Sequence, residues 1–192
     1  MKNVIILGAS GSLAKEVIEQ LKSDKGINLT LFLRNKNRIS NIDLSSCIII
    51  EGDVMNYNSL KDAIQGQDII YGNLAGDLGK MATNIVKAMN ETGVKKIIFI
   101  SSIEIYNEPV RAALKSYREA ADVIEASDLD YTILRPTWFT NVDEVDYEIT
   151  HKGEPEKGSV IARKSIAAFV SEIINNPDKY RRKNLGINKP NS

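Results

Sequence analysis

The chain has 192 residues, 43% of them hydrophobic and 26% charged, and its 25 acidic and 25 basic side chains give a formal net charge of zero. This composition predicts one globular domain and argues against a nucleic-acid or membrane surface built on bulk charge. Its longest apolar runs fall far short of the roughly 20 residues of a membrane span, so we expect a cytoplasmic protein. The single Cys47, expected to be buried, excludes an internal disulfide, and the single His151 excludes a histidine-rich metal centre.

Apolar runs alternate with helical patterns along the whole chain. Strands are predicted at residues 4–7, 29–33, 48–50, 68–71, 96–100, 131–134 and 185–187, and helices at 12–23, 58–64, 81–89, 112–126 and 165–174. Strands joined by helices of this length pair in parallel, and strands that are apolar throughout are typical of sheets buried on both faces. We therefore expect a doubly wound parallel α/β sheet of the Rossmann type. The polar stretch 141–158 is predicted to form a mobile loop or lid.

A phosphate-binding turn is predicted where the first strand runs into the first helix. Gly8 can supply the turn, Gly11 the close approach of backbone to phosphate, and Ala14 the close packing of helix on strand. The spacing is G-x-x-G-x-x-A, with the strand before it and the helix after it that a dinucleotide diphosphate requires. The predicted diphosphate contacts are Gly8, Ser10, Gly11, Ser12 and Leu13.

Basic residues follow the second predicted strand. An NAD site has an acidic residue at this strand end to accept the ribose hydroxyls, but here the position is held by Arg34. The Arg34 guanidinium can meet a 2′-phosphate with charge-assisted hydrogen bonds, and Arg38 or Lys36 can add to it. The pattern favours NADPH over NADH. The alternative is that these side chains form only a solvated loop.

These features resemble a known family. The glycine turn, the strand-end Arg34, Gly52-Asp53-Val54, Ser101-Ser102 and the run from Asp130 to Pro136 are similar to atypical short-chain dehydrogenase/reductases. Within that group the chain most resembles the NAD(P)H-binding, NmrA-like and flavin/biliverdin-reductase-like branch. The resemblance covers nearly the whole chain, and it implies a single NAD(P)-binding Rossmann domain over residues 1–192, with a small substrate or lid region around 136–160.

The resemblance also implies roles for particular residues. The adenine would contact Asp53 and Val54, and Ser102 would face the substrate. The cofactor's ribose and diphosphate would lie against Leu74, Ala75 and Gly76, and the nicotinamide beside Pro136 and Thr137.

Short-chain dehydrogenases usually protonate substrate with a tyrosine whose pKa is lowered by a lysine one helical turn later. By the family's spacing, Ala113 holds the tyrosine position here and Tyr117 the lysine position. The dyad is absent, and Lys115 lies on another face of the helix from Tyr117. The remaining catalytic candidates are Ser102 and Tyr117, although Tyr117 can also serve only as an aromatic wall.

Two functions follow from these features. The first is an NADPH-dependent reductase acting on a planar acceptor such as a quinone or flavin, because NADPH carries the hydride chemistry and such acceptors can draw a proton from solvent. Its pocket would be shaped by Ser102, Tyr106, Tyr117, Trp138 and Phe139. The second is an NADP(H)-binding redox sensor of the NmrA kind that binds a protein partner without turnover. A homodimer is compatible with either.

Overall fold

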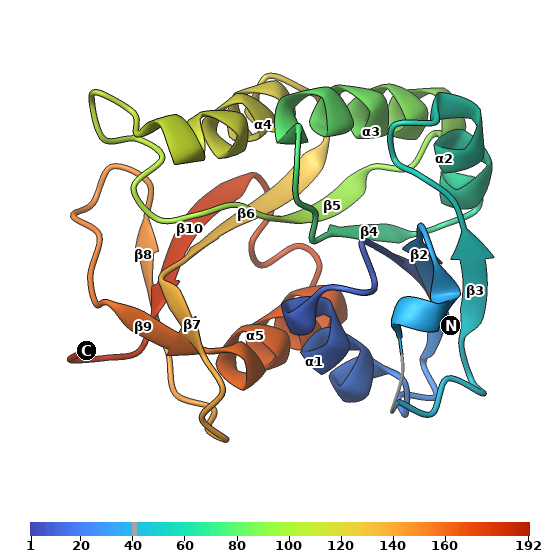
Figure 1. The fold of residues 1–192 in the computed structure, drawn as a ribbon, viewed down its shortest axis with the longest axis horizontal. Helices are drawn as coiled ribbons and strands as arrows, with labels where there is room; N and C mark the ends of the chain where they lie inside the picture. Colours follow the sequence, from blue (N-terminus) through green and yellow to red (C-terminus); the bar gives the residue numbers. More distant parts are fainter. Residues whose placement is uncertain (40–41) are drawn as a thin grey trace.

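A computed structural model describes residues 1–39 and 42–192 and contains a central sheet covered by helices on both faces (Figure 1). The strand order of this eight-stranded sheet is β3-β2-β1-β4-β5-β6-β10-β8. The strands are β1 Lys2–Leu7, β2 Ile27–Leu33, β3 Ile48–Glu51, β4 Ile69–Gly72, β5 Lys96–Ile100, β6 Asp130–Pro136, β8 Glu148–His151 and β10 Lys183–Asn188. All neighbours pair in parallel except β8 with β10. The expected doubly wound α/β sheet is confirmed.

The helices divide into two layers. Figure 1 shows α2, α3 and α4 across one face of the sheet and α1 with α5 across the other. The bounds are α1 Ser12–Leu21, α2 Tyr57–Ile64, α3 Leu78–Thr92, α4 Lys115–Glu125 and α5 Arg163–Asn175, with short 3₁₀ turns η1 Lys36–Arg38 and η2 Ala112–Leu114. No helix within the described residues has the length and apolarity that crossing a membrane requires.

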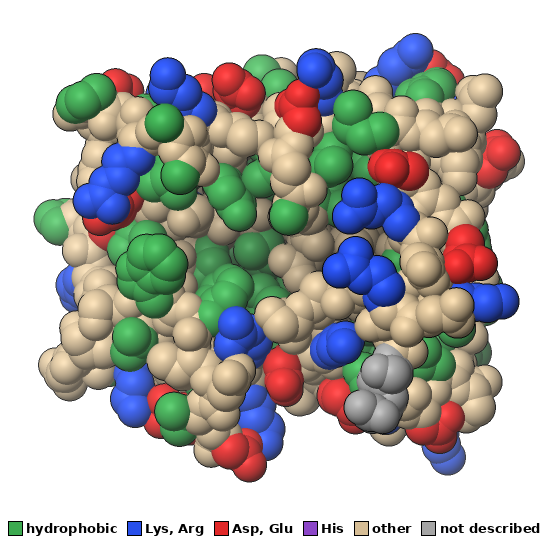
Figure 2. Space-filling view, in the orientation of Figure 1, with side chains coloured by type: hydrophobic (Ala, Val, Ile, Leu, Met, Phe, Trp, Pro, Cys, Tyr) green, Lys and Arg blue, Asp and Glu red, His purple; other side chains and the backbone are tan. Residues whose placement is uncertain are grey.

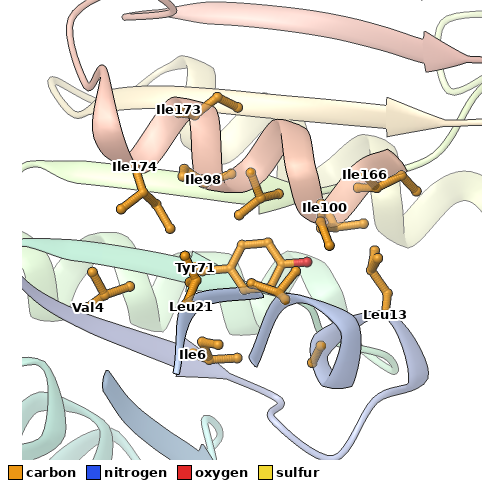
Figure 3. Close-up of a cluster of buried hydrophobic side chains, with 14 of the residues drawn as sticks. Val4, Ile6, Leu13, Leu21, Tyr71, Ile98, Ile100, Ile166, Ile173 and Ile174 are labelled. Atoms are coloured by element: carbon orange, nitrogen blue, oxygen red, sulfur yellow. The ribbon is translucent and has the colours of Figure 1, made fainter. Parts of the chain in front are cut away.

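Each layer has its own core. In the layer of α1 and α5, Tyr71 of β4 lies among aliphatic side chains such as Leu21, Ile98 and Ile174 (Figure 3). The inner strands are apolar on both faces because both are covered, which is why they read as continuous apolar runs. Strand order reverses between β1 and β4, and in open α/β sheets ligands bind outside the carboxyl ends of the strands at this point.

Three expectations need correction. First, β3 is an edge strand, so its apolar side chains are not buried on both faces: Ile48 is 58% and Ile49 41% exposed, and Cys47 is only partly buried. Second, the helix expected from residue 112 begins as the 3₁₀ turn η2, and α4 starts at Lys115.

The third correction concerns residues 138–162, which contain regular structure. The expected loop at 141–158 includes β8, which pairs antiparallel with β10. A small second sheet pairs β7 Trp138–Thr140 with β9 Val160–Ala162 in parallel. These strands are only three or four residues long, too short for an alternation pattern to be visible in the sequence.

Candidate functional site

The turn between β1 and α1 has a conformation that requires glycine at one position. Gly8 has φ +83°, and a Cβ there would overlap the carbonyl oxygen of Asn73. The N–H of Gly11 donates to the carbonyl of Gly8 at 3.0 Å, and Gly11 is the N-cap of α1 with an ordinary φ of −68°. The turn therefore brings bare backbone to the N-terminus of α1, as binding of a diphosphate requires.

A cleft of about 300 Å³ opens over this turn. It is lined by Gly8, Ser10, Gly11, Ser12, Leu13, Phe32, Leu33, Arg34, Arg38, Gly52, Asp53, Val54, Asn73, Leu74, Ala75, Met81 and Phe139. The structure thus brings together in one cleft eleven of the cofactor contacts expected from the sequence. Gly76 is not among the lining residues, and its carbonyl accepts a hydrogen bond from Ser116 Oγ at 3.0 Å. Pro136 and Thr137 lie in a neighbouring cavity.

Two arginines lie at one end of the cleft. Arg34 follows β2, and Arg38 ends the turn η1, in which the Asn35 side chain accepts from the Asn37 N–H at 2.9 Å. Over residues 1–39 and 42–192, neither arginine is in a salt bridge. The nearby Glu51 accepts from the Lys36 N–H at 2.8 Å and does not line the cleft. This end suits a phosphate.

The residues that follow β3 form another wall of the nucleotide cleft. Val54 is buried, and its carbonyl is held by Asn84 Nδ2 at 3.1 Å. Asp53 accepts from the Met55 N–H through Oδ1 at 2.9 Å, which fixes its carboxylate at the cleft. A Cβ at Gly52 would collide with the ring of Phe32, so this close approach explains a glycine that the sequence pattern alone does not.

A second cavity of about 300 Å³ adjoins the first, and Phe139 lines both. Its walls are Ser101, Ser102, Ile103, Glu104, Arg111, Ala113, Leu114, Tyr117, Pro136, Thr137, Trp138 and Phe139. Figure 2 shows the hollowed face, with apolar side chains in and beside the hollow and Lys and Arg side chains gathered to its right. We name this second cavity the acceptor pocket. Both catalytic candidates, Ser102 and Tyr117, are among its walls.

Half of the residues that line the acceptor pocket are polar, and two of them, Glu104 and Arg111, form an ion pair at 3.0 Å. Ala113 lines it where the family would have its tyrosine, and Lys115 is not a lining residue. The hydroxyls of Ser101 and Thr137 are buried and have no hydrogen-bond partner within the described part of the chain. A buried hydroxyl of this kind is normally satisfied by a bound water or ligand. Ser101 was not expected from the sequence, since serine at a strand end also occurs as a simple loop cap.

Tyr106 lies elsewhere, so its expected place in the pocket is wrong. Its hydroxyl donates to Glu125 at 3.1 Å and accepts from Asn184 Nδ2 at 2.7 Å, and burial together with Glu125 raises its pKa well above the usual value. Arg135, 2% exposed, donates to Asn184 and to Glu156. A buried guanidinium needs such partners, and this network holds the loop after β8 against β6 and β10.

Glu125 is the acidic centre of this network. Burial alone would raise its pKa, but hydrogen bonds from Lys152 at 2.7 Å and Asn184 at 3.0 Å outweigh that effect and lower the pKa below its ordinary value. The carboxylate therefore stabilises the folded protein at neutral pH.

A glycine turn at the end of β1, a cationic strand end after β2 and a cleft at the switch point of a doubly wound sheet define a dinucleotide-binding Rossmann protein. A comparison of the sequence with family models also identifies the family. The chain belongs to the NAD(P)H-binding family, whose family model matches residues 8–177.

Solved structures agree with this assignment. A Rossmann-fold NAD(P)-binding protein from Shigella flexneri is 48% identical, with a TM-score of 0.92 over 100% of this chain and 95% of that one. A short-chain dehydrogenase/reductase from Veillonella parvula, solved in complex with NADP, is 26% identical, with a TM-score of 0.91 over 99% and 95% of the two chains. The resemblance to short-chain dehydrogenase/reductases is confirmed.

Among curated proteins, the isoflavone reductase homolog A622 from Nicotiana tabacum is 24% identical over 204 residues. That match covers 91% of this chain but 64% of the relative, so the chain spans less than two thirds of that protein's length.

Proposed function

We propose that this protein is a cytoplasmic NADPH-dependent reductase that transfers a hydride to a planar acceptor such as a quinone or flavin. The observation that carries the proposal is the acceptor pocket: a cavity whose accessible surface is mainly apolar and which shares Phe139 with the nucleotide cleft. A flat, largely apolar acceptor is the ligand class that such walls suit. The relative named for isoflavone reductase and the Veillonella parvula structure with bound NADP support the same reading.

Residues of the cleft would hold the cofactor along its length. Arg34 and Arg38 would bind the 2′-phosphate, and Asp53 and Val54 the adenine. The turn from Gly8 to Leu13, with Leu74 and Ala75 opposite, would hold the diphosphate and ribose. Gly76 would not contact the cofactor directly; its carbonyl accepts a hydrogen bond from Ser116, which would hold the segment containing Leu74 and Ala75 in place. NADPH supplies the hydride when bound.

The acceptor pocket would orient the second substrate. Pro136 and Thr137 would lie beside the nicotinamide, and the aromatic rings of Tyr117 and Trp138 would stack on the acceptor. Trp138 is 77% exposed, which leaves a large ring surface for a ligand to cover. The region around 136–160 would thus serve as the substrate wall. A proton reaches the reduced acceptor from solvent, while the Ser102 hydroxyl donates a hydrogen bond to its oxygen or nitrogen.

The test is steady-state oxidation of NADPH, followed by absorbance, in the presence of a panel of quinones and flavins. We expect turnover with at least one acceptor, and a loss of at least tenfold in kcat/KM in Ser102→Ala, since one hydrogen bond to a developing charge is worth about 1.5 kcal/mol or more. Oxidation by no acceptor, together with tight NADPH binding, would instead favour the NADP(H) sensor with a protein partner.

A further inference from the structure

Arg163, the first residue of α5, connects the phosphate-binding turn to the acceptor pocket. Its Nε donates to Ser12 Oγ at 3.1 Å, across 151 residues of sequence. Its Nη1 donates to the Thr140 carbonyl at 3.3 Å and to Asn141 Oδ1 at 2.6 Å. The guanidinium carbon lies 5.1 Å from the centre of the Phe139 ring. Of these neighbours, Ser12 and Phe139 both line the nucleotide cleft.

The charge of Arg163 is not neutralised by these contacts. Every acceptor named above is uncharged, and no salt bridge to Arg163 occurs in the part of the chain that the structure describes. The guanidinium has five N–H donors, of which three are used by Ser12, Thr140 and Asn141. The two on Nη2 have no acceptor among the described residues. In contrast, the adjacent Lys164 is paired with Asp143.

An anion is a suitable partner for a guanidinium whose described contacts are all uncharged. Arginine is suited to phosphate because its planar fork can donate two hydrogen bonds to one anion. Ser12 is the first residue of α1, and the N-terminus of a helix is suited to bind an anion such as a diphosphate. Arg163 itself lines an adjoining pocket with Glu16, Thr140 and Asn141. It reaches the nucleotide cleft through Ser12 and Phe139, whereas Arg34 and Arg38 line the cleft after β2.

We propose that Arg163 binds the diphosphate of the bound cofactor through its free Nη2 donors and, through Thr140 and Asn141, holds β7 and its Phe139 wall against that cofactor. This proposal rests on the family's cofactor binding but not on turnover or on a preference for NADPH. Because one guanidinium would then contact both the cofactor and β7, cofactor binding is transmitted to the Phe139 wall.

The experiment compares Arg163→Met with Lys164→Met, which removes the same charge from the next residue. Affinity for NADP and for 2′-AMP, which lacks the diphosphate, is measured by calorimetric titration. We expect Arg163→Met to weaken NADP binding about tenfold and to leave 2′-AMP binding unchanged. Lys164→Met should bind both ligands as the wild type does, and Arg163→Lys should restore part of the NADP affinity.

The chain's only tryptophan, Trp138, lies on β7 and provides a second readout. Saturating 2′-phospho-ADP-ribose, which has the diphosphate but no nicotinamide, should change Trp138 fluorescence in the wild type and change it much less in Arg163→Met. Melting curves of the free proteins establish that each variant is folded.

Two results would overturn the inference: unchanged NADP affinity in a folded Arg163→Met variant, or an equal loss of affinity for both ligands, which would mean a general structural role. An equal fluorescence change in both proteins would overturn the link to β7. The proposed reductase function fails differently, through absence of NADPH oxidation by the wild type.

Discussion

Exchanging Arg34 for glutamate should reverse the cofactor preference. Arg34 lines the cleft at the end of β2 and has no ion-pair partner in the described chain, so its guanidinium is free for a 2′-phosphate. A hydrogen bond to a charged group contributes about 1.5–3 kcal/mol, and we take the lower end because this side chain is exposed. Losing it weakens NADPH binding about tenfold.

The new carboxylate adds a second effect. Like charges about 4 Å apart repel by roughly 1 kcal/mol in water and more at a protein surface, so a further loss of about tenfold follows. NADH avoids this repulsion, and its ribose hydroxyls can donate to the carboxylate. We therefore expect NADPH affinity to fall about a hundredfold while NADH affinity rises a few fold.

The assay is equilibrium titration of NADPH and NADH by nicotinamide fluorescence at fixed ionic strength. Lys36→Glu is the matched control, because it makes the same change of charge two residues away at a side chain that does not line the cleft. The reasoning is refuted if the wild type prefers NADH, if Arg34→Glu keeps the wild-type preference, or if Lys36→Glu shifts it equally.

Three further outcomes are expected. Gly11→Val should abolish NADPH titration yet leave the circular dichroism spectrum native, because φ at Gly11 is ordinary, whereas the same change at Gly8, with φ +83°, should also lower the melting temperature. Tyr117→Phe should lower kcat by less than the 10²–10⁴-fold typical of losing a general acid, and by no more than Ser102→Ala; a thousandfold loss would show that Tyr117 is the acid. The pKa of Glu125 is lowered in the folded protein, so this carboxylate stabilises the fold above its ordinary pKa of 4.5, and the stabilisation is lost as pH falls through the folded-state pKa. Glu125→Gln should therefore reduce the dependence of the melting temperature on pH between about pH 5 and 3. The same dependence in the variant and the wild type would contradict this assignment.

Eleven residues that line the nucleotide cleft could be singled out from the sequence because the pattern that marks them is local. One strand, one turn and one helix form the turn predicted to bind the diphosphate, and the positive φ at Gly8 leaves little choice of residue there. The strand-end Arg34 sits at a fixed distance along the chain from that turn. Phe32 and Met81 also line the cleft but were not predicted to do so, because an apolar residue in the sequence looks the same whether its side chain lines a cleft or packs in the core.

The acceptor pocket depends instead on segments with weak local signals. Its walls come from the loop after β5, from η2 and from β7. Tyr106 was expected among these walls and is not one of them. Nothing in the sequence near Tyr106 indicates that its hydroxyl turns toward Glu125 and Asn184, since both partners are distant in the chain. The expected loop at 141–158 failed for a related reason, because β8 exists only through its pairing with β10.

Arg163 shows how these two parts of the site become one. Its place at the start of α5 looks, in the sequence, like an ordinary basic residue on a helix, yet α5 packs beside α1 and brings the guanidinium to Ser12. Packing of two helices on one face of the sheet thus joins the locally encoded diphosphate turn to β7, a wall of the acceptor pocket. Changes in the length of the segment between β6 and α5 can then reshape the acceptor pocket while the cofactor turn stays fixed, provided that this contact is kept.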